Sequence, residues 1–154
     1  MAAEPTPTDK TIIQETLDNI KYVAWHDIRL INEDEGEGVT MRMPARDDLL
    51  NYVGTGHAGA IYTLAETAAG VTADSVAQTM DAYILLRGAE VSYTRRAEGD
   101  LTARGIVSTQ AAGLAREAFT ESSRADFPVE VDIRDREDKS VFLGSFNYAL
   151  RPRS

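Results

Sequence analysis

The first periodic segment of the chain is helical. In "TIIQETLDNIKYVAW" (residues 11–25), apolar side chains follow one another at steps of four, three and four residues, at Ile13, Leu17, Ile20 and Ala24. This spacing places them on one face of an α-helix. Thr11 and Gln14 have the spacing of a capping box, which predicts that the helix begins at Thr11.

The period then changes from helical to alternating. In "DIRLINEDEGEGVTMRMPA", apolar and polar residues alternate, most clearly at Val39, Met41 and Met43. A period of two is typical of a strand with one buried face. Gly36 and Gly38 interrupt the pattern and mark a turn, so the segment is predicted to form a β-hairpin.

The most apolar stretch of the chain is predicted to be a central helix. The segment from about His57 to Val71 is rich in helix-favouring alanine and is apolar nearly all round, as in a helix buried on most sides. Gly54 and Gly56 precede it and suit a loop with unusual backbone angles. A single carboxylate, Glu66, lies within the stretch. Burying an ionised carboxylate without partners is costly, so Glu66 is expected to be paired, neutralised or used in chemistry.

The remainder of the chain is predicted to consist mainly of strands. Four segments alternate in the required way: "GAEVSYTRRA", "LTARGIVSTQ", "FPVEVDIRD" and "SVFLGSFNYALRP". Gly105 in the second predicts a β-bulge. The segment "AAGLAREAFTESSRAD" is compatible with a continued strand or with a loop that holds one helical turn. The resulting order predicts an α+β fold, in which an antiparallel sheet curls around the central helix.

Length and composition are those of one globular domain. The chain has 154 residues, of which 43% are apolar, enough for one sizeable core. Residues 1–10 are polar and contain proline, which predicts a disordered lead-in to a single domain over residues 11–154. No window approaches 18 uninterrupted apolar residues, so no membrane partner is expected and a cytoplasmic location is the default.

Charge and residue usage narrow the range of functions. The net charge of −9 argues against a general nucleic-acid binder. Arg95, Arg96 and Arg104 nevertheless form a local concentration of positive charge that suits an anionic small molecule. Because the chain has no cysteine and only two histidines, His26 and His57, neither a disulfide, nor a thiolate nucleophile, nor a metal site is expected.

The stretch "NYVGTGHAGAIYTLAE" resembles a motif of hotdog-fold acyl-CoA thioesterases, most closely the phenylacetic-acid-pathway (PaaI-like) and THEM2-like thioesterases. The resemblance covers roughly residues 21–152. The family pattern is an Asn, a short Gly-containing loop, His-Gly-Gly and a helix with an acidic residue, and the matching positions are Asn51, His57, Ala58, Gly59 and Glu66. "SYTRRAEGD" and "VEVDIRDRED" resemble later strands of the family.

This resemblance implies both architecture and activity. It implies a hotdog fold, with an antiparallel sheet wrapped around a long central helix and dimerisation through the sheet edge. The implied reaction is hydrolysis of an acyl- or aryl-CoA thioester to the free acid and CoA. No cofactor is implied, since coenzyme A enters as part of the substrate. The implied assembly is a homodimer or a dimer of dimers.

The residues of the motif suit this chemistry. Free N–H groups of the first helical turn, near Ala58 and Gly59, can stabilise a developing oxyanion, and Glu66 can act as a general base or as a nucleophile. Glu66 lies about 12 Å along the helix from Ala58, so one helix cannot easily present both groups to one carbon atom. Two antiparallel helices at a twofold axis can do so, which predicts composite sites in a dimer. Apolar surroundings are expected to raise the pKa of Glu66.

Each of the remaining candidates has a structural and a functional interpretation. Asn51 either shapes a turn or holds a water or carbonyl, and His57 either caps the helix or positions catalytic groups. Thr63 and Thr67 are candidates for substrate binding or simple helix packing. Arg95 and Arg96 either contact the phosphates of coenzyme A or form a solvated face.

Two other functions remain open. A non-catalytic acyl-CoA-binding hotdog protein is one, because Ala58 stands where the family often has Gly and Leu86 where some members have Ser or Thr. An acyl dehydratase or hydratase is the other. It is the less favoured, because such enzymes typically have a Pro-Gly pair at the start of the helix and a longer spacing from His to acid.

Overall fold

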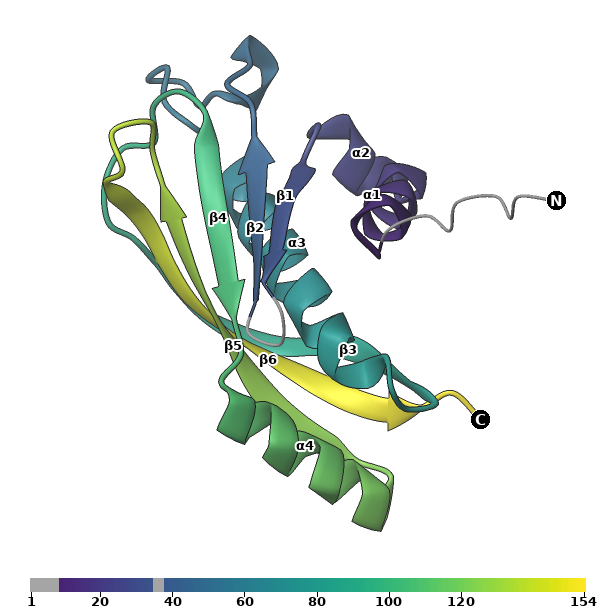
Figure 1. Cartoon of the computed structure of the whole chain (residues 1–154). Helices are drawn as coiled ribbons and strands as arrows, with labels where there is room; N and C mark the ends of the chain where they lie inside the picture. Colours follow the sequence, from purple (N-terminus) through teal and green to yellow (C-terminus); the bar gives the residue numbers. More distant parts are fainter. Residues whose placement is uncertain (1–8, 35–37) are drawn as a thin grey trace, which may run out of the picture.

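The structure, a computed structural model, describes residues 9–34 and 38–154. Its elements in chain order are α1 (Asp9–Asn19), α2 (Lys21–Trp25), β1 (Arg29–Asp34), β2 (Gly38–Met43), a 3₁₀ turn (Asp47–Leu49), α3 (Ala58–Ala77), β3 (Ala82–Tyr93), β4 (Leu101–Ile106), α4 (Thr109–Ser122), β5 (Ala125–Arg134) and β6 (Ser140–Pro152). The strands form one sheet, and α3 lies across one face of it (Figure 1). Of the lead-in predicted over residues 1–10, residues 1–8 lie outside the described residues, and the last two are helical, because α1 begins at Asp9. Of the two glycines predicted to mark a turn, Gly36 lies outside the described residues and Gly38 begins β2.

The sheet confirms the predicted strands. Its order is β1-β2-β4-β5-β6-β3, and every neighbouring pair is antiparallel. The predicted hairpin is β1 with β2, and the four later strands are β3 to β6. β3 begins at Ala82, six residues before the predicted segment, and ends at Tyr93, four residues before the end of that segment. Inward-facing residues alternate with outward-facing ones along β5, the buried set being Ala125, Phe127, Val129, Val131 and Ile133. One face of the sheet is therefore apolar, and α3 covers it.

The central helix is longer than predicted and is buried as expected. It extends to Ala77 rather than Val71. Several of its side chains have no exposed surface, namely Leu64, Ala65, Ala68, Ala69 and Ala73. Small side chains on this helix let the sheet approach closely, which maximises dispersion contact between the two layers.

Gly105 is a contact point between helix and sheet, not a bulge. Its register is continuous on both sides, with Val39 on β2 and Val131 on β5 as its partners, so the predicted β-bulge is wrong. A Cβ at Gly105 would lie 2.6 Å from Thr72 Oγ1 and 2.8 Å from the carbonyl oxygen of Ala68. Glycine is needed here because α3 crosses the strand at that point.

The segment after β4 forms α4, which neither of the two sequence interpretations anticipated. Ser108 caps the helix by accepting a hydrogen bond from the Ala111 amide at 3.0 Å. The buried side chains of α4 are two alanines, Ala112 and Ala115. The apolar face of this helix is therefore narrow, and the helical period in its sequence is weak. The helix packs mainly against β5 (Figure 1).

The N-terminal helical segment is broken in two. Leu17 is buried and Ile13 half-buried as predicted, but Ile20 and Ala24 are exposed, because Ile20 is extended (φ −89°, ψ 98°) between α1 and α2. The predicted capping box is also wrong, since α1 begins at Asp9 and Thr11 lies inside it.

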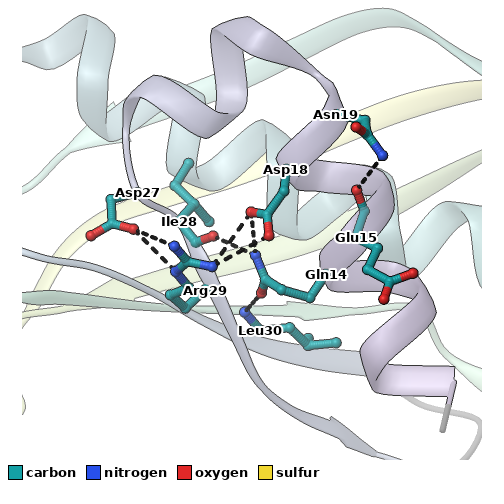
Figure 2. A network of polar contacts seen from close by, with 8 residues as sticks. All are labelled: Gln14, Glu15, Asp18, Asn19, Asp27, Ile28, Arg29 and Leu30. Atoms are coloured by element: carbon teal, nitrogen blue, oxygen red, sulfur yellow. Dashed lines mark hydrogen bonds and ion pairs between the residues drawn. The ribbon is translucent and has the colours of Figure 1, made fainter. Parts of the chain in front are cut away.

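Gln14, assigned to that capping box, instead ties α1 to the first strand. Its Nε2 donates to the Ile28 carbonyl at 3.2 Å, and its Oε1 accepts from the Leu30 amide at 2.7 Å (Figure 2). Arg29 adds ion pairs to Asp18 and Asp27 in the same network. These contacts hold the N-terminal helices beside α3.

Candidate active site

The loop that leads into α3 is folded around the side chain of Asn51. Its Oδ1 accepts hydrogen bonds from the amides of Val53 and Thr55, each at 3.1 Å, and its Nδ2 donates to Thr55 Oγ1 at 3.1 Å. Gly54 has φ +81°, an unusual backbone angle of the kind predicted for this loop, whereas Gly56, for which the same was predicted, does not have a positive φ. Asn51 therefore shapes the loop, because both of its polar atoms are engaged within it.

His57 is the N-cap of α3. Its Nδ1 accepts a hydrogen bond from the Gly59 amide at 2.8 Å. Nδ1 therefore carries no proton while this bond is made, and the ring proton of the neutral form is on Nε2. The Gly59 N–H is thus committed to the cap. Within residues 9–34 and 38–154, the exposed Ala58 amide has no acceptor and is open to a ligand.

The end of β3 and the loop after it dock onto the start of α3. Tyr93 Oη donates to the Ala58 carbonyl at 2.9 Å, and the Gly56 amide donates to the Ala97 carbonyl at 2.8 Å. Arg95 and Arg96 are exposed between these two contacts. They lie in the loop, not in the strand where the sequence placed them, because β3 ends at Tyr93.

Glu66 is half-buried one helical turn before Gly70, and in the described part of the chain one side chain makes a hydrogen bond with its carboxylate. The phenol of Tyr148 on β6 donates to Glu66 Oε1 at 3.1 Å and lies 3.2 Å from the Glu66 carbonyl oxygen. Burial raises the pKa of the Glu66 carboxyl, as predicted, and the Tyr148 hydrogen bond partly opposes this. Burial and the charge of Glu66 raise the pKa of the Tyr148 phenol, which stays protonated and can donate.

The two threonines near Glu66 bond mainly within the helix. Thr63 Oγ1 donates to the Gly59 carbonyl at 2.9 Å, and Thr67 Oγ1 donates to the Thr63 carbonyl at 2.6 Å. The phenol of Tyr22 lies 3.2 Å from Thr63 Oγ1, which links α2 to α3. Thr67 also borders the cavity described next.

A cavity of about 400 Å³ opens beside Glu66. The N-terminal helices, α3, the start of β3 and Arg153 near the C-terminus line it. The sequence predicted apolar surroundings for Glu66, but sequence reasoning missed Tyr148 and the part that the N-terminal helices take in the cavity. The inward position of Tyr148 in the alternation of the last strand was the one available signal for it. Leu86, where some family members have a hydroxyl, packs half-buried against the core.

Among the described residues, no group of three or more His, Cys, Asp or Glu is placed to hold a metal ion. Nor does any described helix have the length and apolarity of a membrane span.

This sheet, wrapped around one long helix, defines the hotdog fold. Residues 26–150 match the sequence profile of a family described as "domain of unknown function (DUF4442)", and the chain belongs to that family. The family is a PaaI-like thioesterase-family domain, which confirms the resemblance seen in the sequence. A comparison with the curated proteins finds no match.

Solved structures share the fold. A Pseudomonas aeruginosa protein of unknown function superposes with a TM-score of 0.82 at 23% identity, over 96% of this chain and 97% of its own. A Haemophilus influenzae thioesterase superposes with a TM-score of 0.72 at 16% identity, over 96% of this chain and 93% of its own. A Staphylococcus aureus thioesterase superposes with a TM-score of 0.71 at 17% identity, over 86% of this chain and 99% of its own. At such identities the likeness establishes the architecture.

Proposed function

We propose that the protein is a thioester hydrolase that converts an acyl- or aryl-CoA to the free acid and CoA. The observation that carries the proposal is a half-buried carboxylate, Glu66, with a raised pKa, at the wall of an apolar cavity. Such a group suits a base that works near neutral pH. Membership of a thioesterase-type family and the thioesterases among the structural neighbours support the same reaction class.

The proposed site is shared between two subunits. Glu66 and Ala58 are eight residues apart on α3, about 12 Å along the axis, so one chain does not bring them together. β3 is an edge strand, and its Leu85 is 57% exposed. Pairing of two β3 edges about a twofold axis would lay two α3 helices side by side and antiparallel. Glu66 would then face Ala58 of the partner subunit.

The reaction needs only groups of the protein and a water molecule. Ionised Glu66 takes a proton from the water molecule while the oxygen of that water attacks the thioester carbon. The carbonyl oxygen becomes an oxyanion, which the amide of Ala58 of the partner subunit stabilises at the helix N-terminus. The C–S bond breaks, the thiolate of coenzyme A leaves, and the proton returns from Glu66 to the sulfur. Direct attack by Glu66, followed by hydrolysis of an anhydride, is the variant with a covalent intermediate.

The remaining candidates take supporting roles in this proposal. Asn51 and His57 hold the loop and the first turn of α3, which keeps the Ala58 amide open. Arg95 and Arg96 border that helix start and are offered as contacts for the phosphates of coenzyme A. Thr63 and Thr67 shape the helix face next to Glu66.

Release of free CoA tests the proposal. Wild type, Glu66→Gln and the control Glu117→Gln, on an exposed position of α4, are compared on a panel of acyl- and aryl-CoAs with a thiol-reactive dye. The protein contributes no thiol background, because it has no cysteine. Loss of about a hundredfold or more in Glu66→Gln alone supports the proposal. Binding of acyl-CoA without turnover by the wild type would instead establish a non-catalytic receptor.

A further inference from the structure

The cavity beside Glu66 follows one face of α3. Glu66, Gly70, Asp74 and Gln78 recur every four residues along the helix, and all four line the cavity. The near end of the cavity has the Glu66 carboxylate. Its middle is lined by apolar side chains, among them Ile13, Leu17, Val23, Val71 and Ile84. Its far end has polar groups, Asp74, Gln78 and Arg153. It is therefore an apolar passage with a reactive end and a polar end.

Gly70 keeps this passage open next to the carboxylate. A Cβ at this position would lie 3.5 Å from the Tyr148 hydroxyl and 3.9 Å from Glu66 Oε1, so a larger side chain would occupy the space beside the reacting group. Glycine in a helix interior costs roughly 0.5–1 kcal/mol relative to alanine. The backbone does not require it here, since residue 70 lies within a regular helix. The space that Gly70 leaves free is what distinguishes it from alanine at this position.

The chain itself covers the passage. α1 and α2 lie beside α3, on the side away from β4 and β5, and share the lining of the cavity with it (Figure 1). Gln14 anchors this cover through its two hydrogen bonds to the backbone around β1 (Figure 2). Tyr22 adds the contact to Thr63. Because the chain's own N-terminal helices form one wall of it, the space is a partly open chamber within one subunit.

We infer that this chamber binds the acyl group of the substrate as an extended, unbranched aliphatic chain, and that Gly70 determines which chain lengths are accepted. The inference rests on the proposed function for the identity of the ligand. The eight residues from Glu66 to Asp74 span about 12 Å, which matches an extended chain of about ten carbons. Longer chains meet the polar end and gain nothing further from burial.

Non-hydrolysable ligands test the inference separately from catalysis. Binding of S-alkyl-CoA thioethers, from ethyl to hexadecyl, is measured by calorimetry on the full-length protein. In the wild type, each added methylene is expected to tighten binding by about fourfold up to decyl, with a plateau beyond. Gly70→Leu is expected to weaken decyl-thioether binding by about 30-fold or more and ethyl-thioether binding much less.

Two further variants serve as controls for folding and helix composition. Gly113→Leu makes the same substitution in α4, where a Cβ meets nothing within 4 Å, and is expected to leave the whole profile unchanged. Gly70→Ala makes only ordinary contacts and is expected to shift the profile in the same direction as Gly70→Leu, by about fourfold on decyl.

The outcomes separate the two proposals. A wild-type affinity that does not depend on chain length, or Gly70 variants with the wild-type profile, overturns the chamber assignment. The first of these results is also the one expected if a segment of the second subunit filled the space. A chain-length profile as described, with no turnover of the matching thioesters, contradicts the hydrolase and leaves the chamber standing. Turnover of acyl-CoA together with a binding affinity that does not depend on chain length supports the hydrolase and overturns the chamber assignment.

Discussion

The phenol of Tyr148 donates a hydrogen bond to Glu66 Oε1 at 3.1 Å, across 82 residues of sequence and from the strand to the helix that it supports. Tyr148 is fully buried, so this bond fixes one carboxylate oxygen and leaves the other for a ligand. Among the described residues Glu66 forms no ion pair, and Tyr148 is the side chain that donates to its carboxylate. The carboxyl group is therefore held in a largely apolar setting by a neutral donor.

Replacing Tyr148 is expected to move the pH profile of the proposed reaction. The hydrogen bond lowers the pKa of Glu66 against the effect of burial, so Tyr148→Phe raises it further. Because the base must be ionised, the acid limb of kcat/KM shifts to higher pH and activity at acidic pH falls most. The pH–rate profile measures this. Tyr52→Phe, at a fully exposed position, is the control, and an unshifted limb in Tyr148→Phe contradicts the role assigned to the phenol.

The Glu66 carboxyl is expected to lower the free energy of unfolding at neutral pH. This carboxyl has a pKa raised by burial in the folded state, so the native protein binds more protons than the unfolded chain between the two pKa values. The free energy of unfolding therefore falls as pH rises through that interval. Glu66→Gln removes this dependence and is expected to be more stable than wild type at pH 7, with the difference shrinking in acid. Urea unfolding at several pH values measures the effect, and a variant less stable at neutral pH counts against it.

His57 is expected to act as a helix cap and not as a proton donor. His57→Asn preserves an N-cap acceptor for the Gly59 amide, whereas His57→Ala removes it and costs about 1 kcal/mol of stability. The asparagine variant is thus expected to retain most of the activity, and the alanine variant to lose stability and activity together. Thermal unfolding and CoA release, measured on both, distinguish the roles. Equal loss of activity in a stable asparagine variant indicates a direct chemical role for the ring.

Arg95 and Arg96 are expected to affect binding of coenzyme A and not the chemical step. Replacing both with alanine should raise KM for acyl-CoA by about fivefold, with kcat unchanged and less effect at high salt. The corresponding N-acetylcysteamine thioester has no phosphates, so its kinetics should not change. Arg124→Ala, at an exposed position between α4 and β5, serves as the charge control. An equal effect on both substrates would contradict the proposed contacts of Arg95 and Arg96 with the phosphates of coenzyme A.

Periodicity was sufficient for most of the architecture. The alternation of "FPVEVDIRD" corresponds to a strand with a buried face, and the all-round apolarity near Glu66 corresponds to a helix enclosed by the sheet. It failed at α4, where the buried residues are alanines that give little contrast. It failed also at Gly105, whose small size serves the packing of α3 and leaves the register unbroken. Both errors come from small residues, whose role depends on what lies opposite.

The candidate site was predictable only in part. The local spacing from Asn51 to Glu66 is a sequence feature, and the structure places these residues on the loop and helix expected for them. The roles of Tyr148 and Gly70 beside Glu66 depend on contacts between distant elements, although the alternation of the last strand already placed Tyr148 on its inward face. The cavity depends on how α1 folds back over α3, which the hydrophobic pattern of α1 does not specify because its stripe breaks at Ile20.

Subunit complementation tests the shared site most directly. Ala58→Pro removes the amide hydrogen proposed to hold the oxyanion, at the first helical position, where proline is well tolerated, and the extended backbone of His57 suits a following proline. Glu66→Gln and Ala58→Pro are each expected to be inactive as homodimers. Mixing them equally by unfolding and refolding should restore about a quarter of the wild-type sites, because each mixed dimer has one intact pair. If native mass spectrometry shows mixed dimers and no activity returns, Glu66 and Ala58 of the partner subunit do not form one site.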